Sequence, residues 1–166
     1  DAPDKMRHAP PRHHSRFYPQ GVPRRLRARK PKGYQAHSPG DCLAWDSIER
    51  RLTGQRRYLI TSTDLASRFG FALGVKSLSS ASAELAWRIQ QHLFPVPTQR
   101  ALPDNGREFG KRFHQAVIAD HITHWHTYPR TPKMNAHCER FNRTLQEEFV
   151  DYQEVLLFDD LDAFND

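Results

Sequence analysis

Short apolar runs separated by turns dominate the first half of the chain. Residues 42–46 are apolar up to a closing aspartate, and residues 57–63 and 69–75 form two further runs. Runs of roughly four to eight residues, bounded by turn residues such as Gly54, are typical of buried strands. Because the connections between the three runs are short, the pattern predicts an antiparallel meander.

Helical spacing takes over after Ser79, a residue type that often caps helix N-termini. Apolar side chains then recur at helical spacing until Pro95 interrupts the pattern. Beyond this proline, the sequence predicts a strand over 98–102, a helix over 109–119 and a strand over 121–128. Strands and helices are therefore expected to alternate in the second half of the chain.

The clearest helix is predicted from Met134 to Tyr152. Its apolar stripe consists of Cys138, Phe141, Leu145, Phe149 and Tyr152. The opposite face carries Asn135, Glu139, Arg143 and Gln146. Such a stripe indicates a helix that lies with one side on the core. The whole pattern predicts an α/β chain of the α+β type, in which helices cover a mixed sheet whose strand order the pattern leaves open.

Charge divides the chain at about residue 37. Residues 1–37 hold ten Lys and Arg against two Asp, a net charge of +8, so residues 38–166 carry −2 of the total +6. The basic segment is rich in Pro and lacks apolar periodicity, which predicts an extended linker or tail. Residues 38–166 suit one folded domain. The basic tail favours contact with a DNA backbone, and a solvated linker is the alternative.

The sequence carries no signal for a membrane or for metal-binding cysteines. No apolar run approaches the roughly 18 residues of a membrane span, and the N-terminus is polar rather than signal-like. We therefore expect a soluble, cytoplasmic protein without a membrane partner. Cys42 and Cys138 form no CxxC pair, so we expect reduced thiols that serve packing rather than catalysis.

Three acidic residues stand where elements end or expose a face. Asp46 closes an apolar strand, Asp104 begins an Asp-Asn-Gly turn and Glu139 lies on the polar face of the long helix. Taken singly, they have ordinary interpretations as a rim carboxylate, a turn residue and a solvent-facing helix residue. Taken together, carboxylates from three elements offer the oxygen ligands that Mg²⁺ prefers, and paired ions of this kind catalyse phosphodiester chemistry.

Four sequence blocks surround these acids. They are GDCLAWD at 40–46, TDLASRF at 63–69, DNGREF at 104–109 and YPRTPKMNAHCERFNRTL at 128–145. On these blocks the chain, from about Pro39 onward, resembles the retroviral-integrase-like catalytic core of bacterial insertion-sequence transposases. The resemblance implies an RNase H-like fold with a mixed five-stranded sheet flanked by helices. It also implies a DDE motif in which Asp46, Asp104 and Glu139 are the catalytic residues and the ligands of two Mg²⁺ or Mn²⁺ ions.

The same resemblance implies metal-dependent cleavage of DNA ends and strand transfer into target DNA, as in integration and transposition, by a homo-oligomer assembled on DNA. Asp41 and Asp64 compete for the first motif position, but the resemblance assigns it to Asp46. Pro103 and Ala136 depart from the family's usual Thr and Gly, and we expect a core that is truncated at its C-terminus. A degenerate transposase that serves only as a DNA-binding or oligomerisation module stays open, as does a nuclease of the same fold.

Polar and basic residues near Glu139 are candidate DNA contacts. They are Lys133, Asn135, Arg140 and Arg143. Arg143 follows Glu139 by one helical turn, so it can reach a phosphate or pair with Glu139. Lys133 and Asn135 lie at the helix N-terminus, which suits either phosphate binding or capping.

Histidines and tryptophans invite other interpretations. His121, His124 and His126 suggest a zinc site, but a regular strand points His121 away from the other two. Three histidines without a fourth ligand favour structural or surface roles. Trp45, Trp87 and Trp125 are expected to be core aromatics rather than platforms for DNA bases.

Overall fold

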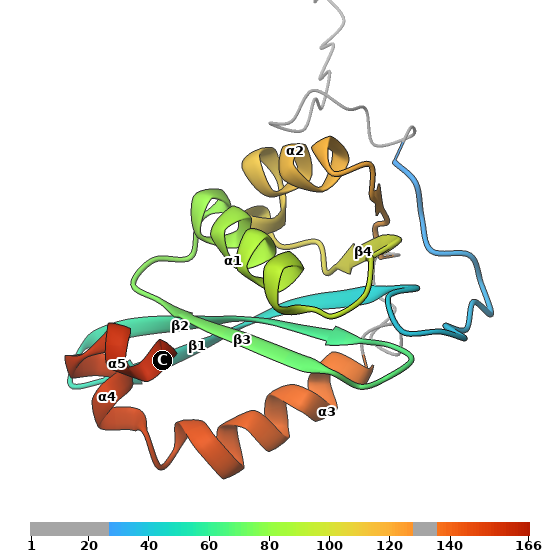
Figure 1. The fold of residues 1–166 in the computed structure, drawn as a ribbon. Coiled ribbons are helices and arrows are strands. Elements are labelled where there is room, and N and C mark those ends of the chain that lie inside the picture. Colours follow the sequence, from blue (N-terminus) through green and yellow to red (C-terminus); the bar gives the residue numbers. More distant parts are fainter. Residues whose placement is uncertain (1–26, 128–135) are drawn as a thin grey trace, which may run out of the picture.

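The computed structural model describes residues 27–127 and 136–166, in which one mixed sheet organises the chain (Figure 1). Its strands are β1 (Leu43–Leu52), β2 (Gln55–Asp64), β3 (Gly70–Val75), β4 (Arg100–Pro103) and β5 (Thr123–His124). They lie in the order β3-β2-β1-β4-β5. The first three strands pair antiparallel, as the meander predicts, whereas β4 and β5 run parallel to β1.

Helices cover both faces of this sheet. They are α1 (Ser80–Leu93), η2 (Arg107–Phe109), α2 (Lys111–Ala119), α3 (Ala136–Leu145), η4 (Gln146–Val150), α4 (Glu154–Asp159) and α5 (Leu161–Asn165). Figure 1 shows α1 and α2 on one face and α3 on the other, with α4 and α5 near the far end of the β1–β3 meander. This is the predicted five-stranded α/β architecture of the RNase H-like type. No helix in the described part of the chain has the length and apolar character of a membrane span.

Aromatic side chains fill the core between the sheet and the α1–α2 face. Trp45 on β1, Trp87 on α1 and Phe113 on α2 are fully buried. The ring centroid of Trp45 lies 5.7 Å from that of Trp87 and 5.4 Å from that of Phe113. Trp125 is also buried, so the prediction that all three tryptophans serve the core is confirmed.

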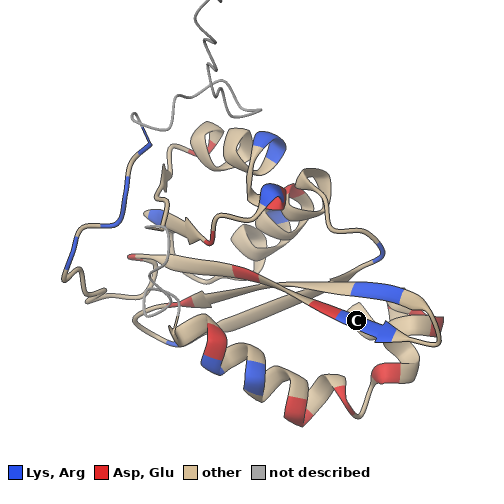
Figure 2. Ribbon diagram, turned by 180° about the vertical axis from the view of Figure 1, so that it is seen from behind, with Lys and Arg blue, Asp and Glu red and all other residues tan. Residues whose placement is uncertain are grey.

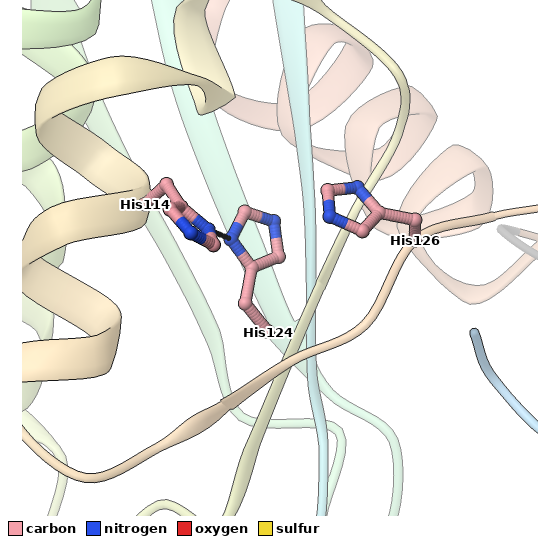
Figure 3. A group of neighbouring side chains, drawn as sticks. All are labelled: His114, His124 and His126. Atoms are coloured by element: carbon pink, nitrogen blue, oxygen red, sulfur yellow. Dashed lines mark hydrogen bonds between the residues drawn. The ribbon is translucent and has the colours of Figure 1, made fainter. Parts of the chain in front are cut away.

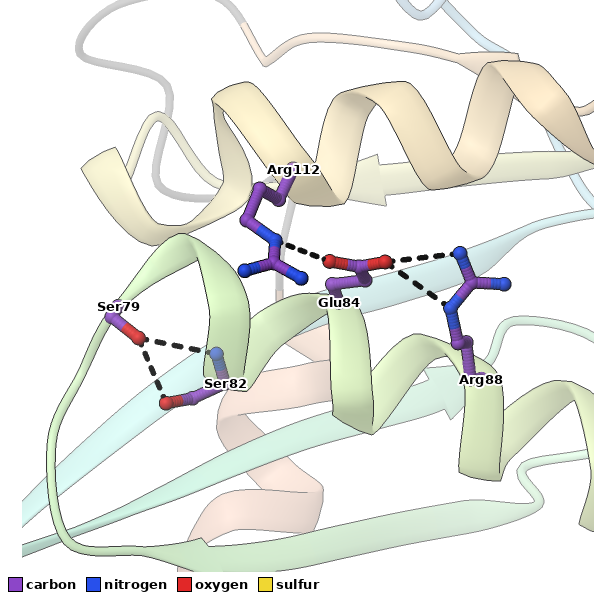
Figure 4. Close-up of polar contacts among 5 residues, drawn as sticks. All are labelled: Ser79, Ser82, Glu84, Arg88 and Arg112. Atoms are coloured by element: carbon purple, nitrogen blue, oxygen red, sulfur yellow. Dashed lines mark hydrogen bonds and ion pairs between the residues drawn. The ribbon is translucent and has the colours of Figure 1, made fainter.

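Polar contacts hold α1 in place at its start and along its exposed side (Figure 4). The Oγ of Ser79 accepts a hydrogen bond from the backbone N–H of Ser82, so the predicted cap is confirmed. Glu84 accepts from Arg88 on the same helix at 2.9 Å and from Arg112 on α2 at 2.6 Å. The second contact ties the two helices together.

The opposite face of the sheet is covered by α3. Cys138 is buried there in a cluster with Ala44 and Leu102. The ring of Phe141 lies so close to Gly70 on β3 that a Cβ at this position would collide with it. Burial raises the pKa of both cysteine thiols to about 12, which leaves no thiolate for catalysis at neutral pH.

The long helix departs from its prediction at both ends. Residues 128–135 lie outside the described residues, and α3 ends at Leu145, where the π-helix η4 begins. The backbone N–H of Asp151 donates to the carbonyl of Gln146, five residues earlier, and this wider turn shifts the register of the side chains. As a result Val150 is buried, while Phe149 and Tyr152 are exposed, so their placement on the buried stripe was wrong.

The last strand is also shorter than predicted. Only Thr123 and His124 pair with β4 in a regular strand. After the N–H of Trp125 donates to Ala101, the N–H of His126 donates to the carbonyl of Ala28 at 2.9 Å. The chain therefore changes partners, because the segment before β1 lies along this edge. Tyr34 from the same segment packs edge-on against Trp125, with ring centroids 4.8 Å apart.

Candidate active site

Asp46 lies within β1, which continues to Leu52, so the prediction that it closes the strand was wrong, and Asp104 directly follows the parallel strand β4. Trp45 on β1 is the register partner of Pro103 on β4, and the N–H of Asp104 donates to the carbonyl of Trp45 at 3.2 Å. Side chains alternate along a strand, so Asp46 lies on the same face as Ala44, toward α3. The β1–β4 pairing thus brings two aspartates, far apart in sequence, to one edge of the site.

Helix α3 brings Glu139 and Asn142 to the same place. The Nδ2 of Asn142 donates to Oδ2 of Asp46 at 2.9 Å, and the backbone N–H of Ser47 donates to Oδ1 of Asp46 at 2.8 Å. Glu139 lies one turn before Asn142, is exposed, and acts electrostatically on Asp46. Both oxygens of Asp46 are therefore held, and the negative charge of Glu139 on α3 acts on it.

The site concentrates negative charge in partly buried surroundings. Burial raises the pKa of Asp46, and the charges of Glu139 and Glu108 raise it further. Burial likewise raises the pKa of Asp104 to about 6, with contributions from Asp46 and Glu108. The hydrogen bond from the N–H of Gly106 to Oδ1 of Asp104, at 2.8 Å, opposes this shift. Like charges crowded in this way favour a bound cation.

No family model and no curated protein matches the sequence. Solved structures do. The HTLV-2 integrase catalytic core domain in complex with magnesium matches in its dimeric form with a TM-score of 0.61, at 19% identity over 76% of this chain and 81% of that chain. In its trimeric form it matches with a TM-score of 0.62, at 20% identity over 76% of this chain and 80% of that chain.

A chain of the simian T-cell lymphotropic virus intasome, in complex with the PP2A regulatory subunit B56 gamma, matches with a TM-score of 0.67 at 19% identity. The fold is that of an integrase catalytic core. The match covers 84% of this chain but 51% of the intasome chain, so this integrase-like core spans about half of that relative. At these identities the likeness concerns the fold alone.

The integrase-like core also contains a fourth acid, Glu108, which the sequence analysis missed. It is buried at 8% exposure, and its Oε1 accepts from the Oγ of Ser47 at 2.7 Å. Gly106 lets the turn fold back on itself, because a Cβ there would lie 2.7 Å from the Glu108 carboxylate. The sequence signal was the position of Glu108 four residues after Asp104, at the end of the same turn. Asn142 was missed because a polar residue was not expected on the buried stripe.

The donor chemistry of this site fits a hard cation. Asp46, Asp104 and Glu139 offer only oxygen ligands, which Mg²⁺ and Mn²⁺ prefer. However, these three carboxylates do not form a close cluster. Across residues 27–127 and 136–166, the group of three or more potential ligands gathered closely enough to hold an ion consists of His114, His124 and His126. The assignment of the three carboxylates as metal ligands stays a prediction.

Two of the four candidate DNA contacts can be located. Arg140 and Arg143 are exposed on α3, whose ribbon carries both basic and acidic positions (Figure 2). The ion pairs of the described residues do not include one between Glu139 and Arg143. Lys133 and Asn135 lie outside the described residues.

A pocket of about 610 Å³ opens beside Asp104. Three basic residues line it: Arg27, Arg107 and Lys111. Ser79 and Ser80, at the start of α1, also contribute to its wall. Backbone N–H groups at a helix start and basic side chains both favour anions, so this pocket suits a phosphate close to the acidic site.

Proposed function

We propose that this chain is the catalytic core of a DNA transposase or integrase, which cleaves DNA ends and transfers the strands into target DNA. Asp46, Asp104 and Glu139 are its catalytic residues and hold two Mg²⁺ or Mn²⁺ ions. The observation that carries the proposal is the β1–β4 register, which brings Asp46 within β1 next to Asp104 just after β4, with the charge of Glu139 acting on Asp46 from α3. The fold of an integrase catalytic core supports it.

Bound ions of this type activate a nucleophilic oxygen and stabilise the leaving oxygen of a phosphodiester. Neighbouring residues of the chain orient the carboxylates that would hold these ions. Asn142 and the N–H of Ser47 fix the two oxygens of Asp46, and the N–H of Gly106 fixes Oδ1 of Asp104. Asp104 then presents its other oxygen to the site. Such prior orientation lowers the cost of organising ligands and substrate during the reaction.

DNA binding follows from the distribution of basic residues. Arg107 and Lys111 line the pocket next to Asp104, so they would hold a phosphate close to the acids. We also propose phosphate contacts for Arg140 and Arg143 on α3, and for Lys133 and Asn135. Residues 1–37, with a net charge of +8, would act as a basic segment that follows the DNA backbone.

Joining two DNA ends requires two active sites in one assembly, so we propose a homo-oligomer on DNA. The solved relatives are described in dimeric and trimeric forms and as part of an intasome, which supports this view. A degenerate core that only binds DNA or oligomerises is the second candidate. One observation favours it: the three carboxylates are gathered less closely than the three histidines.

The two candidates differ in one assay. The full chain is incubated with Mn²⁺ and DNA carrying the ends of its own element, and joined products and DNA binding are measured in parallel. The proposal predicts joined products that Asp46→Asn and Asp104→Asn abolish while DNA binding persists. DNA binding without metal-dependent nicking or joining by the unaltered chain would support the degenerate module instead.

A further inference from the structure

Three histidines form a cluster beside β5 that includes none of the carboxylates of the candidate active site. His114 comes from α2, His124 from β5 and His126 from the extended chain that follows β5. His121, which the sequence analysis considered, is exposed in the turn between α2 and β5 and has a positive φ of 60°. This turn packs β5 against α2, which brings His114, rather than His121, next to His124.

The three rings face one another closely. Figure 3 shows His124 between His114 and His126. The Nδ1 atoms of His114 and His124 lie 2.7 Å apart, and the rings of His124 and His126 stack with centroids separated by 4.4 Å. One ring nitrogen from each histidine lies within 4.8 Å of the other two.

We propose that His114, His124 and His126 form a binding site for a first-row transition metal, for which Zn²⁺ is the simplest probe. Imidazole nitrogen suits Zn²⁺, Cu²⁺ and Ni²⁺, whereas Mg²⁺ prefers oxygen. With Zn–N bonds of about 2.0–2.1 Å, ligand nitrogens in a tetrahedral site lie about 3.4 Å apart. One nitrogen of each ring lies within 4.8 Å of the other two, so side-chain rotations that bring the three nitrogens to this spacing would create the site.

An unpartnered nitrogen provides independent support. His124 is 6% exposed, and its Nε2 is buried without a hydrogen-bond partner. A neutral imidazole carries one N–H donor and one acceptor nitrogen, and leaving either one unpaired in the interior is unfavourable. A metal bound at Nε2 of His124 would give this nitrogen a partner. Three protein ligands leave a fourth position open, and His126 also lines the pocket beside Asp104, so water can reach it.

The low pKa values of these histidines favour metal binding, whereas the positive charge of Arg27 opposes it. Burial lowers the pKa of His124 well below its usual value and that of His126 to about 4, so protons compete little for these nitrogens at neutral pH. Arg27 lies near enough to lower the pKa of all three histidines, and its charge opposes a dication in the same way.

The site would fasten the N-terminal segment to the core. The N–H of His126 donates to the carbonyl of Ala28, and Arg29 forms a parallel bridge with His126. A metal that holds His126 against α2 also holds this contact. Its consequence is slower exchange of the His126 amide hydrogen in the presence of Zn²⁺.

Histidines in the basic tail would compete for the probe, so the experiment uses the full chain with His8, His13 and His14 changed to Gln. Zn²⁺ binding is measured by calorimetry, and Co²⁺ binding by the visible absorption of its tetrahedral complex. Circular dichroism without metal checks the fold of each variant. His114→Gln and His126→Gln each remove one ligand, and the exposed His121→Gln is the matched control.

We expect a Zn²⁺ site in this background whose affinity falls about tenfold or more with His114→Gln and with His126→Gln and does not change with His121→Gln. Either ligand variant suffices for the test if the other fails to fold. Absence of Zn²⁺ binding in the background itself, or equal affinity in a folded ligand variant, would overturn the proposal. The outcome is independent of strand transfer, because the site shares no ligand with the carboxylates.

Discussion

The side chain of Asn142 on α3 donates to Oδ2 of Asp46 on β1 across 2.9 Å. This hydrogen bond connects the helix that carries Glu139 to the strand that carries the first aspartate. Because it favours the charged form of Asp46, it lowers a pKa that burial and neighbouring acids raise.

Asn142→Ala should therefore raise the pKa of Asp46 further. Carboxyl NMR titration of the metal-free protein measures this value directly. Thr144→Ala, at an exposed position of the same helix, serves as the control and should leave it unchanged. An Asp46 pKa that stays the same or falls in Asn142→Ala would show that the hydrogen bond does not operate in solution.

Asp104 gives the metal-free protein a pH-dependent weakness. Its pKa is raised from 3.8 to about 6, so its contribution to stability is full below pH 3.8 and is lost as the pH rises through 6. Asp104→Asn keeps the acceptor Oδ1 for Gly106 but removes the charge. We expect it to raise the free energy of unfolding at pH 7 by about 1–2 kcal/mol, after allowance for solvent screening.

Urea unfolding between pH 3.5 and 8 tests this prediction, with the range chosen to span roughly both pKa values. The stability difference between the two proteins should widen from pH 4 to pH 7. Asp162→Asn, at an exposed position on α5, should give no such trend. A variant less stable than the parent at pH 7 would contradict the raised pKa.

The basic residues of the pocket beside Asp104 should contribute to the salt dependence of DNA binding. Arg107→Ala and Lys111→Ala should each weaken DNA binding, and each should reduce the slope of log affinity against log salt by about one unit, because one phosphate is no longer neutralised. Fluorescence anisotropy with a labelled duplex gives both quantities. Arg56→Ala, which removes an exposed charge from the distant β1–β2 turn, is the control. Equal slopes in all proteins would exclude the pocket from the DNA interface.

The register of η4 can be tested by two substitutions. Val150 is fully buried in the cluster with Leu157 and Phe158, whereas Tyr152 is 80% exposed. Val150→Ala should destabilise the fold by about 1–3 kcal/mol, because it leaves a cavity. Tyr152→Ala should change stability by less than about 0.5 kcal/mol. Chemical denaturation distinguishes this order from the reverse order that an uninterrupted α-helix would give.

Local sequence patterns predicted the parts of this fold that depend on local apolar spacing. The runs that became β1, β2 and β3 and the Ser79 cap were visible, because short-range periodicity and turn residues specify them. The π-helix was not visible, since its extra residue per turn arises from packing of Val150 against α4. β5 is short because the N–H of Trp125 donates to Ala101, whereas the N–H of the next residue, His126, donates to Ala28. Both acceptors are distant in sequence from β5.

In the candidate site, too, some residues could be predicted from the sequence and others could not. Asp46, Asp104 and Glu139 could be chosen through the sequence blocks that surround them, although Asp46 lies within β1 rather than at the strand end that the sequence predicted. Glu108 and Asn142 depend on how a turn and a helix face pack against other elements, so their sequence positions alone carried little information. His114 joins His124 only because the turn at His121 reverses the chain.

The central claim is that Glu139 acts with Asp46 and Asp104 in metal-dependent strand transfer. The most direct test compares the full chain with Glu139→Gln and with Glu147→Gln, since both glutamates are exposed and neither substitution should disturb folding. Joined DNA products are measured with Mn²⁺ and the matching DNA ends. We predict products from the parent and from Glu147→Gln but none from Glu139→Gln. Equal product from Glu139→Gln would contradict the claim.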